Sequence, residues 1–138
     1  MTDRQVIIDA SVAVKWFTVI DEANIEEAFA LLAGHRTRQI ELAAPSHMRL
    51  EVLNALRRRQ ADETDLLSAA RSLDLAELSW HEVDHALTRH AISIATTYHL
   101  TIYDAVFAAL ANGLDCELIT ADHALAASGA CKVRLLGH

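Results

Sequence analysis

Hydrophobic residues along the chain alternate between short strand-like runs and longer stripes with helical spacing. The helical spacing is clearest in residues 22–33, where apolar side chains from Ile25 to Leu32 fall at positions i, i+3, i+4 and i+7. Gly34 follows and predicts the end of that helix. The whole pattern predicts strands at 5–8, 40–44, about 77–80, 117–120 and 133–136, and helices from about residue 12 and at 22–33, 47–60, 63–75, 83–98, 102–112 and 122–127.

Polar residues and glycines mark the expected ends of several of these helices. Ser46, directly after Pro45, and Asp62 are both residue types that favour the N-cap position. Gly113 predicts the end of the helix at 102–112. Because strands alternate with helices, the sequence predicts the α/β class, with a parallel sheet that helices cover on both faces.

Composition and length are those of an ordinary globular protein. With 138 residues, 52% hydrophobic and 22% charged, residues 1–138 are expected to form one domain around a single core. No apolar run approaches the ~20 residues of a membrane span. The apolar run near the start is too short for a signal peptide and leads directly into Asp9. We therefore expect a cytosolic protein without membrane contact, in which Cys116 and Cys131 are reduced and packed.

The net charge of −7 disfavours a nucleic-acid partner, because phosphate contacts come from Lys and Arg. The distribution of the basic residues weakens that objection. Ten of the 12 basic residues are arginines, which bind phosphates with two parallel hydrogen bonds, and three of them form the run 57–59. Two interpretations of this run stay open at this point. It is either a phosphate-binding surface or a solvated helix end whose positive charge complements the helix dipole.

Two aspartates follow predicted strands. Asp9 comes directly after the apolar run 6–8, and Asp122 comes just after the run 118–120. In open parallel sheets ligands bind in the crevice beyond the carboxyl ends of the strands, so the two carboxylates are expected to converge there. Each aspartate also opens a helix, and stabilisation by the helix dipole is the alternative explanation.

Two further acids stand where acids are unusual. The helix around Asp104 is apolar on every side, which predicts burial, and a buried carboxylate must find a partner or become neutral. A capping role at the start of that helix is the alternative. Glu51 lies at the edge of the apolar stripe of the helix at 47–60. From there it can reach into a cleft or pair with Arg58 at the surface.

Four converging carboxylates repel one another, by roughly 4 kcal/mol per pair at a separation of ~4 Å and an effective dielectric of 20. A bound cation removes this repulsion. Ligands that are all oxygen favour Mg²⁺ or Mn²⁺ over zinc. Such ions bind phosphates, activate water and stabilise the leaving oxygen of a displacement at phosphorus. The sequence therefore predicts a metal site for phosphodiester hydrolysis formed by Asp9, Glu51, Asp104 and Asp122.

The four acids lie in four short motifs, IIDASVAVKW, LEVLNAL, IYDAVFAALA and LITAD. In this order and at this spacing, over essentially the whole chain, the motifs resemble those of PIN-domain proteins, and specifically the VapC-type toxins of toxin–antitoxin pairs. The resemblance implies a three-layer α/β/α fold with a parallel sheet of about five strands. It also implies a Mg²⁺- or Mn²⁺-dependent endoribonuclease that cleaves RNA, often tRNA or rRNA.

The resemblance also assigns roles and partners. It implies that Asp9, Asp104 and Asp122 hold the metal ion, and that Glu51 completes the metal shell or orients the attacking water. It implies a homodimer and a cognate antitoxin protein that inserts a segment near the acidic pocket. Three further polar residues match positions that lie beside the site in the family: Ser11, Thr120 and Asn54.

Other readings of the same residues fit less well. A haloacid-dehalogenase-type phosphatase needs a second Asp two positions after Asp9, where this chain has Ser11. A receiver domain needs a lysine after a late strand, whereas Lys132 precedes one. His81 and His85 have zinc-ligand spacing but lack a third clustered ligand. The remaining alternative is a PIN-like module that has lost catalysis and acts in binding or interaction, and the presence of all four acids disfavours it.

Overall fold

The computed structural model describes residues 4–138 and contains a five-stranded sheet in the order β3-β2-β1-β4-β5. All neighbouring strands pair in parallel, which confirms the predicted α/β class. The chain lays down its first three strands to one side and then returns to the other side of the first strand. The strands are β1 (Arg4–Ile8), β2 (Ile40–Pro45), β3 (Ser79–His81), β4 (Glu117–Thr120) and β5 (Val133–Leu135).

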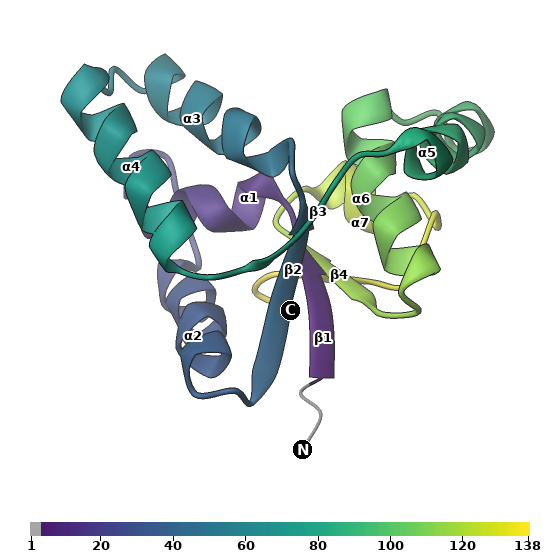
Figure 1. Cartoon of the computed structure of the whole chain (residues 1–138), viewed down its shortest axis with the longest axis horizontal. Coiled ribbons are helices and arrows are strands. Elements are labelled where there is room, and N and C mark those ends of the chain that lie inside the picture. The colour runs from purple at the N-terminus through teal and green to yellow at the C-terminus, as the bar shows by residue number, and fades with distance from the viewer. Residues whose placement is uncertain (1–3) are drawn as a thin grey trace.

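Helices cover both faces of this sheet, so the three-layer α/β/α arrangement is confirmed. Figure 1 shows α1 to α4 on one side of the strands and α5 to α7 on the other. No helix within residues 4–138 is long and apolar enough to cross a membrane. The helices are α1 (Ala10–Ala13), the short 3-10 helix η1 (Val14–Trp16), α2 (Ile25–Arg36), α3 (Met48–Arg58), α4 (Glu63–Leu75), α5 (His85–Tyr98), α6 (Ile102–Gly113) and α7 (His123–Ala127).

The main core surrounds β1, both faces of which are covered by helices. Val6, Ile7 and Ile8 are almost fully buried, as the continuous apolar run requires. Helix α6 is buried from Ala105 to Ala111, as its apolar surface predicts. Small alanines on α5 and α6 form a second cluster between these two helices. Asp9, directly after β1, and Asp104, on α6, are therefore attached to buried elements.

The predicted helix at 22–33 is wrong at both ends. Helix α2 begins only at Ile25, because Asn24 adopts a left-handed conformation (φ 55°) that a helix cannot contain. Gly34 does not end the helix but lies inside it. A β-carbon at Gly34 would lie 3.2 Å from Cγ1 of Ile40, so the glycine permits close packing of α2 against β2.

The predicted N-caps give one correction and one confirmation. Ser46 does not cap α3, because its backbone N–H donates to the carbonyl of His81 and extends the pairing of β2 with β3. His47 takes the N-cap position, with no side-chain hydrogen bond. Asp62 does cap α4, where it forms a reciprocal capping box with Asp65. Gly113, predicted to follow α6, is its last residue.

Candidate active site

The four predicted acids line one cleft at the carboxyl ends of β1 and β4. Asp9 follows β1, Asp122 precedes α7, Glu51 comes from α3 and Asp104 from α6. The cleft has a volume of about 580 Å³. It lies at the point where the order of the strands reverses, which is the usual binding position in open α/β sheets. Residues that are far apart in the sequence are thus brought to one place.

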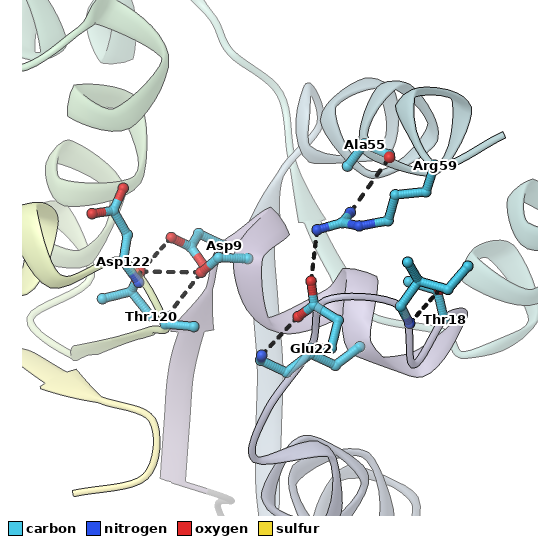
Figure 2. A network of polar contacts seen from close by, with 11 residues as sticks. Asp9, Thr18, Glu22, Ala55, Arg59, Thr120 and Asp122 are labelled. Atoms are coloured by element: carbon cyan, nitrogen blue, oxygen red, sulfur yellow. Dashed lines mark hydrogen bonds and ion pairs between the residues drawn. The ribbon is translucent and has the colours of Figure 1, made fainter. Parts of the chain in front are cut away.

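Asp9 is 5% exposed, and hydroxyl groups hold both of its carboxylate oxygens. Ser11 Oγ donates to Oδ1 and Thr120 Oγ1 donates to Oδ2, each at 2.6 Å. The same hydroxyls accept backbone N–H groups, Ser11 from Ala121 at 2.8 Å and Thr120 from Asp122 at 3.0 Å. Figure 2 shows how this network joins the ends of β1 and β4. Each hydroxyl proton points at Asp9, so the network is arranged for an ionised carboxylate.

The charge on Asp9 has no cationic hydrogen-bond partner among the described residues. Burial raises the pKa of Asp9 from 3.8 to about 6, although the hydrogen bonds from Ser11 and Thr120 lower it. The nearby charge of Asp104 raises it further. Burial therefore outweighs the hydroxyl groups, and the ionised form of Asp9 is held at a cost.

Glu51 is also short of partners. Its Oε1 atom is buried and makes no hydrogen bond. His47 Nε2 lies 3.4 Å away, but this ring nitrogen bonds the carbonyl of Tyr103, and burial lowers the pKa of His47 below 6.5, so the ring is mainly neutral at pH 7. Burial and the charges of Asp104 and Asp9 raise the pKa of Glu51 to about 7. The contact with His47 is therefore not an effective ion pair.

Asp104 and Asp122 differ in how far a capping role explains them. The N-cap of α6 is Thr101, whose Oγ1 accepts the N–H of Asp104 at 3.1 Å, so the Asp104 carboxylate is not needed as the cap. Burial and the charge of Asp122 raise the pKa of Asp104. Asp122 does cap α7, accepting the N–H groups of Ala124 and Leu125, but both bonds use Oδ1. Its Oδ2 atom takes no part in the cap.

These residues fit a hard divalent cation in their chemistry. Their donors are all carboxylate oxygens, and Glu51 Oε1 is a buried oxygen without a hydrogen bond. The raised pKa values of Asp9, Glu51 and Asp104 show that burial and mutual repulsion disfavour their charged forms, which a cation would relieve. Within residues 4–138, however, no three His, Cys, Asp or Glu side chains form a group that could hold a metal ion as they stand. Binding of an ion would require these carboxylates to move closer together.

The supporting residues predicted from the sequence are not all at the cleft. Ser11 lines it, and Thr120 contacts Asp9 directly. Asn54 is exposed and does not line the cleft. On α3 the residues that line the cleft are Glu51, Ala55 and Arg58, and Asn54 borders this row on the solvent side, three residues after Glu51 and four before Arg58.

A group of charged residues in the cleft wall was not predicted. Lys15 Nζ and Arg59 Nη2 both donate to Glu22, at 2.7 Å each, and all three side chains line the cleft. Glu22 is 37 residues from Arg59, so local sequence gives no sign of this pairing. Arg58 also lines the cleft, without the surface pairing to Glu51 considered from the sequence, while Arg57 is exposed outside it.

Residues 6–129 match the PIN domain family, and no curated protein matches the chain. Solved structures that match include VapC20 of Mycobacterium tuberculosis, described as a Sarcin-Ricin loop cleaving toxin (TM-score 0.75, 19% identity, 94% of this chain and 98% of that chain). A DNA-bound VapBC from Salmonella typhimurium has a TM-score of 0.68 at 16% identity, over 97% and 98% of the two chains. A toxin–antitoxin complex from Klebsiella pneumoniae has 0.66 at 15%, over 94% and 95%. These structures share the fold of this chain.

Proposed function

Because the chain belongs to the PIN-domain family, we propose that it is a Mg²⁺- or Mn²⁺-dependent endoribonuclease and the toxin of a toxin–antitoxin pair. One observation carries this proposal: four carboxylates from four separate elements line one cleft. The raised pKa values of Asp9, Glu51 and Asp104 support a role for a cation there. The toxin and toxin–antitoxin structures that share the fold support the biological role.

In this proposal Asp9, Asp104 and Asp122 hold the divalent cation and Glu51 completes its surroundings. The cation, when bound, activates water and stabilises the charge that develops on the phosphate oxygens. Ser11 and Thr120 fix the orientation of the Asp9 carboxylate through their hydroxyl groups. Glu51, in its ionised form, accepts a hydrogen bond from the attacking water and orients it.

The partners follow from the same proposal. The substrate is RNA, with tRNA or rRNA as the expected class, and the toxin is held inactive by a cognate antitoxin protein. The chain acts in the cytosol as a homodimer. Toxin–antitoxin complexes among the structures that share this fold support the antitoxin partner.

Cleavage of RNA by purified, antitoxin-free protein tests the proposal. We expect cleavage with Mg²⁺ or Mn²⁺, none in EDTA, and a loss of about 100-fold or more in Asp104→Asn, because a metal ligand is removed. The control is Asp84→Asn, which removes the same charge from the exposed N-cap of α5 and keeps capping ability. Equal activity in the two variants, or cleavage in EDTA, would overturn the proposed site.

The second candidate is a PIN-like binding or interaction module without catalysis. This alternative is favoured if purified protein cuts no RNA with either metal ion and Asp9→Asn is as toxic on expression as wild type.

A further inference from the structure

We propose that Arg59 binds a backbone phosphate of the RNA next to the acidic site, and that Glu22 is the residue that positions Arg59 for it. This inference rests on the proposed function, because it adds a substrate-binding subsite to the same cleft. The residues that carry it are Lys15, Glu22 and Arg59, whose side chains line the cleft beside the four acids.

The three side chains form a charge network in which Glu22 bridges Lys15 and Arg59. Glu22 Oε1 accepts from Lys15 Nζ and Glu22 Oε2 accepts from Arg59 Nη2, both at 2.7 Å. Lys15 and Glu22 are 5% and 7% exposed, whereas the Arg59 side chain is 25% exposed. Figure 2 shows Glu22 reaching up from its loop toward Arg59 at the end of α3. Arg59 is therefore the member of the network that can meet a ligand.

Glu22 leaves donor capacity on Arg59. A guanidinium group carries five N–H donors, of which Nη2 gives one to Glu22 and Nη1 gives one, at 3.4 Å, to the carbonyl of Ala55. The remaining donors are enough for a phosphate, which arginine binds with two parallel hydrogen bonds. With two of its N–H groups fixed, Arg59 is held in one orientation and loses little freedom when a ligand binds.

The charge of the cleft favours such a residue. Four carboxylates repel a polyanion, and the basic Lys and Arg side chains that line the cleft are Lys15, Arg58 and Arg59. Lys15 is buried and its ammonium group is already paired with Glu22, so it is not available to a ligand. Arg58 is exposed and makes no ion pair with any of the described residues. Arg59 is the one that the fold holds in place, and this is why we assign the phosphate contact to it.

A buried charge network is a poor source of stability, because apolar side chains of similar volume pack as well without the desolvation cost. Its position supports a functional reason. Glu22 ties the loop between η1 and α2 to the end of α3, and Asp21, Glu22 and Asn24 from this loop form one wall of the cleft. The network thus fixes the wall and the arginine together.

Binding of a short fluorescein-labelled single-stranded RNA of mixed sequence, measured in EDTA so that no cleavage occurs, tests this proposal. Arg59→Gln is expected to weaken binding about tenfold and to reduce the slope of log K against log salt by about 0.7, the value for one phosphate contact to a single strand. Arg57→Gln, which removes the same charge from the exposed surface of the same helix, is expected to change binding by no more than about twofold.

Glu22→Gln separates positioning from bulk charge. Removing a negative charge should strengthen RNA binding if only the net charge matters, as expected for the control Glu26→Gln on the exposed side of α2. If Glu22 positions Arg59, Glu22→Gln weakens binding instead. Thermal melting of each variant verifies that it is folded, and Arg59→Gln tests the subsite independently.

The proposal is overturned if Arg59→Gln weakens binding no more than Arg57→Gln, or if Glu22→Gln strengthens binding as much as Glu26→Gln. Because binding is measured without metal or turnover, this result does not depend on whether the protein cleaves RNA. Loss of the subsite with retained cleavage, or the reverse, therefore shows which of the two proposals has failed.

Discussion

Two buried carboxylates line the same cleft and are satisfied in opposite ways. Asp9 receives its hydrogen bonds from the neutral hydroxyls of Ser11 and Thr120. Glu22 receives its hydrogen bonds from the cations Lys15 and Arg59. Both acids are less than a tenth exposed, so burial alone does not distinguish them. We therefore expect Asp9, whose charge has no cationic partner, to bind a cation from solution, whereas the charge of Glu22 is already neutralised by Lys15 and Arg59.

Neutral isosteres of the two acids should therefore change stability in opposite directions, and the larger effect is expected at Glu22. Glu22→Gln leaves the buried Lys15 without a negative partner and is expected to lower the free energy of unfolding by about 3 kcal/mol or more. Chemical denaturation measures this loss. Glu26→Gln on the exposed side of α2 is the control and should change stability by less than about 0.5 kcal/mol. Equal effects of the two variants would show that the network does not hold the loop.

For the second carboxylate, Asp9, the neutral variant Asp9→Asn is expected to stabilise the metal-free protein. The folded pKa of Asp9 is about 6 and the reference value is 3.8, so the folded state binds this proton more tightly and loses stability as the pH rises through that interval. A difference of about 2 pKa units corresponds to ~3 kcal/mol. Asp9→Asn should therefore gain up to ~3 kcal/mol near pH 8 and little near pH 4.

Denaturation of wild type and Asp9→Asn at the two pH values in EDTA checks this sign. If Asp9→Asn destabilises the protein near pH 8 as Glu22→Gln does, the proposed difference between Asp9 and Glu22 is wrong. The hydroxyl groups would then stabilise the ionised Asp9 fully.

A smaller effect is expected from the hydroxyl groups themselves. Thr120→Val removes the hydrogen bond to Asp9 and the acceptor for the N–H of Asp122, and should cost about 1–3 kcal/mol. Because that hydrogen bond lowers the pKa of Asp9, its loss raises this pKa further, and the acid limb of the pH–activity profile moves to higher pH. Thr96→Val, whose hydroxyl bonds only carbonyls of its own helix, is the control and should leave the profile in place.

The sequence predicted most of the fold because its signals are local. The apolar run before Asp9 gave a strand, Asp62 gave a helix cap, and the all-apolar helix around Asp104 proved buried. Gly34 misled because a glycine can serve close packing as well as a helix end, and only the neighbouring Ile40 shows which. Ser46 misled because its N–H is used by the distant strand β3.

The candidate site divides in the same way. Asp9 and Asp122 could be predicted because each follows an apolar strand and the ends of parallel strands meet, and Asp104 because its helix is apolar on every side, whereas Glu51 rested mainly on the family pattern. The network of Lys15, Glu22 and Arg59 could not be predicted, because in the sequence each residue resembles an ordinary surface charge. His47, which contacts Glu51, lacked any signal beyond its position before α3. Asn54 was placed by family pattern, and it lies exposed beside the residues of α3 that line the cleft.

The central claim is that the four carboxylates in the cleft bind a divalent cation. It is tested most directly by titrating the protein with Mn²⁺ in a calorimeter near pH 8. The account predicts saturable binding to wild type, a loss of about tenfold or more in affinity in both Asp9→Asn and Asp104→Asn, and unchanged binding in the control Asp84→Asn. Binding should weaken toward pH 5, because protons compete for Asp9 and Glu51, whose pKa values are about 6 and about 7. Absence of binding to wild type, or equal binding in all four proteins, would contradict the account.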